Sequence, residues 1–250
     1  MTHNDRVRTD PAQRGLPVLR TVAVVGVLVG LNIADHVLGW SSLWIGPAGA
    51  MLLVAYARAC GLTWHELGMA RATHGPGLRW GLGVVGVVAL VYAVGVAIPA
   101  TRTAFLDARY HLPPAQVLIT ALLVIPVGTV LLEEVAFRSV LWGMLQRHAR
   151  TTRVLLASSA LFGLWHVLPA LSTASSTALG GLTAVAERLG IGPAGAMAVV
   201  VVATVLFTAL GGVVAGELRR RSGSVLASMG MHWATNGLGV LVGMLAWQLA

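Results

Sequence analysis

Seven long apolar stretches, joined by short polar connections, make up most of the chain. Each reaches or approaches the roughly 20 residues that a helix needs to cross the hydrocarbon core of a bilayer. The predicted spans cover residues 21–39, 42–57, 80–98, 115–136, 154–171, 195–214 and 224–247. The pattern therefore predicts an all-α protein, a polytopic transmembrane helical bundle of about seven spans.

The polar segments divide this pattern into three regions. Residues 1–17 are rich in arginine and are expected to form a flexible cytoplasmic tail. Residues 18–114 are expected to hold the N-terminal transmembrane helices, with an interfacial segment at 62–79. Residues 115–250 are expected to form the helical core that carries the chemistry. Within that core, the loop at 172–193 is rich in small residues and is predicted to be partly helical around 182–189.

The composition is that of an integral membrane protein. Of the 250 residues, 56% are hydrophobic and 10% are charged, whereas a soluble domain carries about a quarter charged residues. An ordinary cytosolic globule and a disordered chain are both excluded. The net charge of +8 comes from 17 arginines that lie between apolar runs. We therefore expect membrane lipid, and no nucleic acid, as a partner. The single cysteine, Cys60, excludes a disulfide framework.

The arginines also predict an orientation. Thirteen of them fall on one side of a seven-span arrangement, whereas the other side holds Arg102, Arg109 and Arg188. Because positively charged connections stay in the cytoplasm, the N-terminus is predicted to be cytoplasmic and the C-terminus to lie outside. We expect a multi-pass protein of the cell membrane.

Ionisable side chains inside spans are costly, so they mark candidate functional sites. The fourth predicted span carries Glu133, Glu134 and Arg138. Glu134 and Arg138 stand four residues apart and can pair on one helix face. Glu133 is rotated by about 100° from its neighbour. The cation therefore holds one carboxylate ionised, and the other is free for a different role.

Two further blocks lie on other spans. Phe162 and His166 stand four residues apart on the fifth, and His232 and Asn236 on the seventh. With a rise of about 1.5 Å per residue, the three blocks reach similar depths in the membrane. A carboxylate could take a proton from water that an imidazole orients, while His and Asn could donate to an oxyanion. Taken singly, each block is more often a packing device between helices.

Asp35 and His36, near the outer end of the first span, are expected to reach the lipid headgroups instead.

The three blocks closely resemble the CPBP family of intramembrane proteases, also called the CAAX-protease and bacteriocin-processing, or Abi, family. That family is marked by Glu-Glu-x-x-x-Arg, Phe-x-x-x-His and His-x-x-x-Asn, each on its own span. All three motifs occur here in that order, and the likeness covers roughly residues 115–237. The resemblance implies a hydrolase, an intramembrane endopeptidase whose active site opens toward the cytoplasm. Its substrate would be a membrane-associated protein or peptide.

The resemblance also implies a role for each motif residue. Glu133 would activate the attacking water and His166 would help to hold it, while His232 and Asn236 would stabilise the oxyanion. The supporting residues would be Glu134 and Arg138 beside the base, and Phe162, which would shape the site.

The cofactor requirement stays open at this point, because the family has been described both as metalloendopeptidases and as glutamate-dependent proteases. Zinc, if used, would be bound by Glu133, His166 and His232. The pairing of His232 with Asn236 suits an oxyanion better than a closed ligand set, so no metal is favoured.

Two other functions compete with hydrolysis. One is a non-catalytic membrane scaffold or immunity protein of the same fold. The other is a proton-coupled transporter that uses Glu133 and the histidines as a relay. The sequence contains no internal repeat, which weighs against the transporter. Prenylation of the substrate is not carried over by the resemblance.

Overall fold

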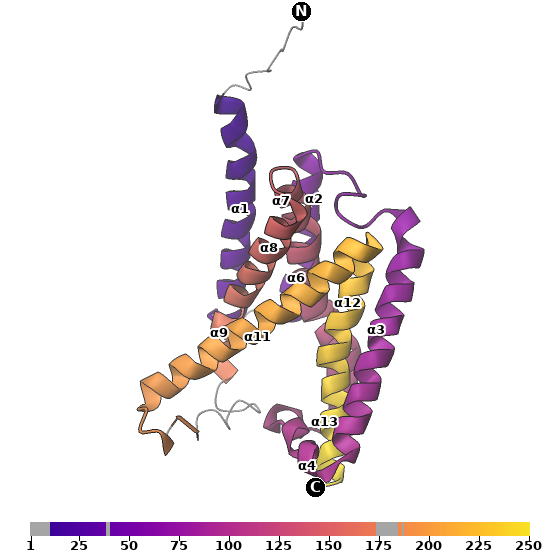
Figure 1. Ribbon diagram of the computed structural model, residues 1–250, viewed down its shortest axis with the longest axis vertical. Coiled ribbons are helices and arrows are strands. Elements are labelled where there is room, and N and C mark those ends of the chain that lie inside the picture. The colour runs from indigo at the N-terminus through magenta and orange to yellow at the C-terminus, as the bar shows by residue number, and fades with distance from the viewer. Residues whose placement is uncertain (1–10, 39–40, 174–184, 187) are drawn as a thin grey trace, which may run out of the picture.

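The computed structural model describes residues 11–38, 41–173, 185–186 and 188–250, and this part of the chain is helical without a strand (Figure 1). The predicted all-α class is confirmed there. The helices are α1 (Pro11–His36), α2 (Ser42–Ala59), α3 (Arg71–Ala97), α4 (Pro99–Arg102), α5 (Pro114–Ile119), α6 (Leu131–Glu134), α7 (Trp142–Gln146), α8 (Thr151–Trp165), α9 (Val167–Thr173), α11 (Pro193–Ser222), α12 (Val225–Trp233) and α13 (Gly239–Gln248). Two short 3-10 turns, η1 (Thr103–Phe105) and η2 (Ala108–Tyr110), follow α4. Three π-helical stretches, η3 (Thr120–Val130), η4 (Val135–Leu141) and η5 (Ala234–Leu238), continue the α-helices beside them.

Five helical segments of the described chain are long and apolar enough to cross a membrane. They are Val18–His36, Arg71–Ala97, Pro114–Gln146, Thr151–Leu171 and Pro193–Ser222. The other two predicted spans, 42–57 and 224–247, are also helical but fall outside this group. The first is short and ends beside Arg58, and the second is interrupted by polar residues such as His232 and Asn236. The count of seven and the cytoplasmic N-terminus stay predictions.

The helix α3 begins at Arg71, nine residues before the span that was expected from Trp80. Only the first part of the expected interfacial segment, up to Ala70, is therefore outside a helix. Hydropathy marks the part of a helix that lies in hydrocarbon, and a 27-residue helix extends to about 40 Å, beyond the bilayer core. Of the helix expected around 182–189, residues 182–184 and 187 lie outside the described residues, and residues 185, 186 and 188 are helical.

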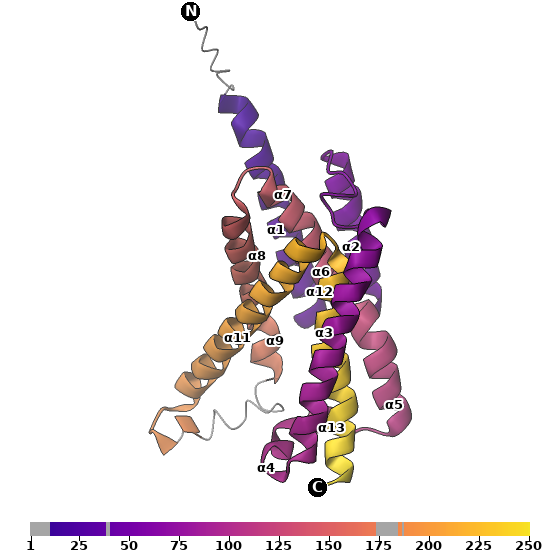
Figure 2. The ribbon, with the colours of Figure 1, turned by 45° about the vertical axis from the view of Figure 1, so that its right-hand side comes forward.

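The helix that carries Glu133 runs through the centre of the bundle. All seven residues of η4 are buried. In both views α12 and α13 lie alongside α3, whereas α11 packs across α8 and diverges from α13 toward its own N-terminal end (Figure 1 and Figure 2). The motif helices therefore meet at the middle of the bundle.

Polar contacts bind the connection between α2 and α3 to the helices at the centre of the bundle. Ser139 donates to the carbonyl of Leu67 at 2.7 Å, and the Nη2 of Arg219 donates to the carbonyl of Glu66 at 2.9 Å. The side chain of Glu66 pairs with Arg147 at 2.7 Å. The hydrogen bond from Arg147 lowers the pKa of Glu66 to about 2. Glu66 and Arg147 therefore stay paired over the whole physiological pH range.

Close helix contact is expected to make Gly46 intolerant of a side chain. A Cβ at this position of α2 would lie 2.5 Å from the carbonyl oxygen of Val127, in the backbone of η3. We predict that Gly46→Ala lowers the stability by about 1–3 kcal/mol, the usual cost of overpacking. Gly30→Ala on α1 is the control, because its Cβ meets no atom within 4 Å. Thermal unfolding of both variants in detergent would measure the difference, and equal melting temperatures would contradict it.

The single cysteine tests the predicted orientation. Cys60 is partly exposed and lies just after α2, on the predicted cytoplasmic side. In intact cells, a membrane-impermeant maleimide is expected to label Cys60 only after the cells are opened. A Cys60→Ser, Thr101→Cys variant places the thiol at the opposite side of the membrane and should be labelled from outside. The reverse pattern would show that the N-terminus is not cytoplasmic.

Candidate active site

The helices that carry the three motifs are all irregular where the motif residues lie. Glu133 and Glu134 occupy the single α-turn of α6 between η3 and η4. His166 stands at the break between α8 and α9, and Asn236 lies in η5. π-Helical turns in α-helices are frequent at functional sites, because they redirect side chains and free backbone carbonyls. Irregular turns on three helices therefore position this cluster.

Neighbouring helices supply the donors that the carbonyls of η4 accept. Ser158 on α8 donates to the carbonyl of Phe137 at 2.9 Å, and the Nε of Arg219 on α11 donates to that of Arg138 at 3.0 Å. Buried backbone groups need such partners. These bonds fix η4 relative to α8 and α11.

A buried network of charges joins the first and third motifs. The Nη1 of Arg138 lies 3.2 Å from the Oε1 of Glu134, so the predicted pairing four residues apart is present. The same carboxylate oxygen accepts a hydrogen bond of 2.9 Å from the Nδ1 of His232. Glu134 is fully buried and Arg138 is 1% exposed. Because a buried charge without a partner is very costly, each of these groups depends on the others.

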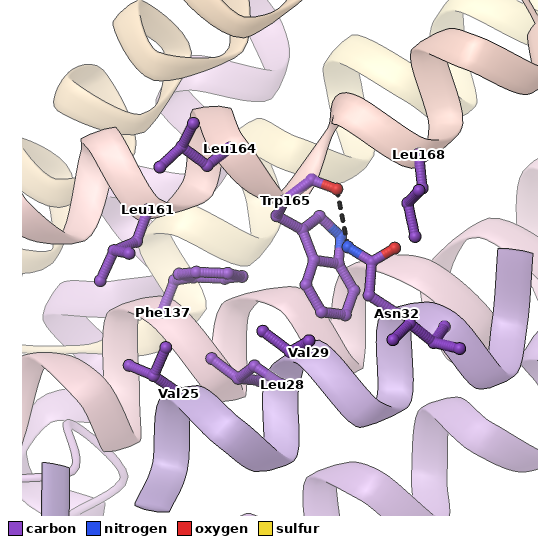
Figure 3. A pocket seen from close by; sticks show the side chains of 10 residues that line it. Val25, Leu28, Val29, Asn32, Phe137, Leu161, Leu164, Trp165 and Leu168 are labelled. Atoms are coloured by element: carbon purple, nitrogen blue, oxygen red, sulfur yellow. Dashed lines mark hydrogen bonds between the residues drawn. The ribbon is translucent and has the colours of Figure 1, made fainter. Parts of the chain in front are cut away.

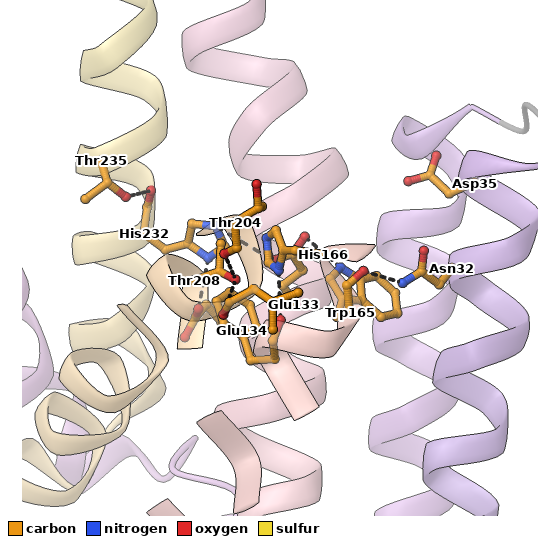
Figure 4. A network of polar contacts seen from close by, with 12 residues as sticks. Asn32, Asp35, Glu133, Glu134, Trp165, His166, Thr204, Thr208, His232 and Thr235 are labelled. Atoms are coloured by element: carbon orange, nitrogen blue, oxygen red, sulfur yellow. Dashed lines mark hydrogen bonds and ion pairs between the residues drawn. The ribbon is translucent and has the colours of Figure 1, made fainter. Parts of the chain in front are cut away.

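Glu133 faces both histidines. Its Oε2 lies 3.9 Å from the Nε2 of His166 and 3.8 Å from the Nε2 of His232 (Figure 4). This oxygen is buried and has no hydrogen-bond partner. The Nδ1 of His166 lies 2.8 Å from the carbonyl of Phe162, to which it can only donate. Both imidazoles therefore hold the Nδ1 proton in a hydrogen bond and direct Nε2 toward the carboxylate of Glu133.

Phe162 forms a wall of the cluster. The guanidinium of Arg138 lies over its ring, 3.9 Å from the centroid. Its ring lies edge-on to the imidazoles of His166 and His232, with ring centroids 4.7 and 5.9 Å away, respectively. The aromatic ring thereby orients the cation and both imidazoles, as expected of a residue that shapes the site.

A cavity of about 370 Å³ opens beside the cluster. The motif residues that line it are Glu134, Arg138, Phe162, His166, His232 and Asn236. Its opposite wall is mostly apolar and comes from α3, α11 and α12, with Tyr92, Phe207, Leu210, Val214 and Met231. A peptide with apolar side chains is the kind of ligand that suits such a wall.

Asn236 differs from the other motif residues in being exposed. It lines the same cavity as His166 and His232. Residues four apart stay on nearly the same side of a π-helix, so η5 does not separate Asn236 from His232, and both side chains reach the cavity.

Two residues of the network have no counterpart among the predicted site residues. The indole N–H of Trp165 donates to the Oε1 of Glu133 at 3.1 Å, and the Nδ2 of Asn32 donates to the carbonyl of Trp165 at 2.7 Å. Trp165 directly precedes the motif histidine, which could have drawn attention to it. Asn32 carries no charge, so a search of the spans for ionisable groups passes over it.

Asp35 and His36 lie at the end of α1 beyond Asn32. The Nδ1 of His36 lies 3.7 Å from the carboxylate of Asp35.

The three residues that were considered as zinc ligands do not fit a metal as they stand. Zinc ligands lie about 2.0–2.2 Å from the metal, which brings tetrahedral neighbours to about 3.3–3.6 Å from one another. The separations of 3.8 and 3.9 Å from Glu133 to the imidazoles are wider. Within the part of the chain that the structure describes, no three His, Cys, Asp or Glu side chains form a group that could hold a metal ion.

Comparison with known proteins identifies the family. The model described as type II CAAX prenyl endopeptidase Rce1-like matches residues 114–238. Comparison with the curated proteins and with the solved structures gives no match. The matched half of the chain contains every motif residue from Glu133 to Asn236, which confirms the resemblance that the motifs indicated. Together with the long apolar helices, the match indicates a multi-pass membrane protein and a CAAX-type protease, that is, a peptide hydrolase. The chain belongs to the Rce1-like family of type II CAAX prenyl endopeptidases.

Proposed function

We propose that the protein is an intramembrane endopeptidase that hydrolyses a peptide bond by means of water activated by Glu133. The observation that carries the proposal is the approach of two imidazole Nε2 atoms to one unpaired carboxylate oxygen, at 3.9 and 3.8 Å. These separations are too long for direct hydrogen bonds and suit one bridging water molecule. Such a water would lie against a base and two orienting groups.

In the proposed reaction, Glu133 takes a proton from this water molecule while the oxygen of the water attacks the scissile carbonyl carbon. The C–N bond then breaks, and Glu133 returns the proton to the leaving amine. The products are a new carboxyl end and a new amino end. A positioned general base contributes about 10²–10⁴-fold to such a step.

The remaining side chains would serve charge and geometry. His166 would hold the water through its Nε2. His232, whose Nδ1 is bonded to the carboxylate of Glu134, could carry a proton on Nε2 and donate it to the oxyanion with help from Asn236. Arg138 would keep Glu134 ionised, so that Glu134 stabilises an imidazolium at His232.

The substrate is proposed to be a membrane-associated protein or peptide. The apolar wall of the cavity, which includes Phe207 and Leu210, supports apolar side chains near the cleaved bond. The positive-inside pattern supports an active site that opens toward the cytoplasm of the cell.

Glu133→Gln is predicted to lower the cleavage rate by at least about 100-fold, because it removes the base but keeps the shape of the side chain. Purified protein in nanodiscs would be incubated with a library of apolar peptides, and products would be measured by mass spectrometry. Glu217→Gln is the matched control, since this partly exposed carboxylate pairs with Arg220 and Arg221 and does not line the cavity. Equal cleavage by the wild type and Glu133→Gln would contradict the assignment. Full rescue of a cellular phenotype by Glu133→Gln would favour a scaffold or immunity protein.

Cleavage is predicted to proceed without a metal. We expect purified protein to keep its activity after exhaustive treatment with 1,10-phenanthroline and EDTA, and to contain zinc well below one equivalent by elemental analysis. The wide spacing of Glu133, His166 and His232 is the reason for this expectation. Loss of activity on chelation, followed by recovery when zinc is added back, would show instead that these three residues bind a catalytic metal.

A further inference from the structure

The two oxygens of the Glu133 carboxylate have different surroundings. Oε2 faces the two imidazoles and has no hydrogen-bond partner. Oε1 accepts the indole N–H of Trp165 at 3.1 Å. A hydrogen bond to a carboxylate is stronger than one between neutral groups. Trp165 therefore restricts the rotation of this carboxylate and directs Oε2 toward the histidines.

The ring of Trp165 is itself held in place. It is 7% exposed and meets Phe137 of η4 edge-on, with centroids 5.7 Å apart. On its other side lies a cavity of about 270 Å³ between α1 and α8, which is lined mainly by aliphatic side chains (Figure 3). Trp165 lines this cavity and is absent from the lining of the cavity beside His166 and His232. Trp165 therefore lies outside the cavity that His166, His232 and Asn236 line.

The backbone of Trp165 needs a donor from outside its own helix. In a continued α-helix the carbonyl of Trp165 would accept the N–H of residue 169, but that residue is Pro169, which has none. Asn32 on α1 provides the missing donor through its Nδ2, at 2.7 Å. The side chain of Asn32 is 7% exposed, and its Oδ1 is buried with no hydrogen-bond partner. An unsatisfied buried acceptor is costly, so the bond to Trp165 is the feature that accounts for an asparagine here.

We propose that Trp165 is a positioning residue for Glu133 and that Asn32 holds Trp165 in place. This inference rests on the proposed role of Glu133 as the base. It makes α1, which lies outside the family match at 114–238, part of the machinery that orients the base. Figure 4 shows the continuous line of contacts from Asn32 through Trp165 to Glu133 and the histidines.

The test is the kinetics of Trp165→Phe, which keeps an aromatic ring against Phe137 and removes the N–H. We expect kcat to fall about tenfold while KM stays within about twofold, because the ring does not line the cavity open to substrate. Asn32→Leu should lower kcat by a smaller factor and also leave KM within about twofold.

Trp247→Phe is the matched control. The indole of Trp247, at the end of α13, donates to the backbone carbonyl of Asp107 at 3.2 Å, and Trp247 does not line the cavity beside the histidines, so the loss of this bond should leave kcat unchanged. If Trp165→Phe does not fold, 3-benzothienylalanine at position 165 keeps the bicyclic shape without an N–H. The inference is overturned if either replacement leaves kcat as in the wild type, or changes KM alone. If the wild type cleaves no peptide, the proposed function itself has failed.

Discussion

The buried ion pair between Glu134 and Arg138 is the constraint on which the rest of the site depends. Both side chains are almost completely buried, and they lie 3.2 Å apart on the central helix. Charges in such surroundings are tolerated only when each is paired. Because Glu134 neutralises Arg138 and also accepts the Nδ1–H of His232, this pair ties the third motif to the first. Glu133 is left with an oxygen that no cation or hydrogen bond occupies.

Irregular helix geometry turns this pair into a site. The α-turn that holds both glutamates is flanked by π-helical stretches, and the helix of the second motif ends at Trp165, before His166. Each irregularity frees backbone groups that other elements then satisfy. Ser158 and Arg219 donate to carbonyls of η4, and Asn32 donates to Trp165. The hydrogen bonds that satisfy these carbonyls therefore also fix the positions of the motif helices relative to one another.

Much of this arrangement follows from the sequence. Apolar runs predicted an all-helical membrane protein, and the four-residue spacing of Glu134 and Arg138 predicted their pairing, because both rest on local periodicity. The bond from His232 to Glu134 and the approach of both imidazoles to Glu133 depend on how separate helices rotate against one another. That rotation is set by close packing at glycines such as Gly46 and by π-turns, which a fixed helical period does not describe.

The residues outside the motifs were hardest to predict. Neither Trp165 nor Asn32 carries a charge. Asn32 matters because Pro169 has no N–H to donate to the carbonyl of Trp165, and because α1 packs close enough to supply the donor. That contact joins residues far apart in the sequence. Asn236 is exposed where it lines the cavity, whereas the other motif residues are buried or partly buried, a difference that the four-residue spacing does not predict. These outcomes belong to tertiary structure rather than to any single segment.

The most direct measurement is an experimental structure of Glu133→Gln with an uncleaved peptide bound. The account predicts that the scissile carbonyl lies in the cavity beside His232 and Asn236. A water molecule should then sit within hydrogen-bond reach, about 2.6–3.2 Å, of the side chain at position 133 and of His166. A peptide bound elsewhere, with its scissile bond separated from residue 133 by more than one water molecule, would contradict the assignment of Glu133 as the base.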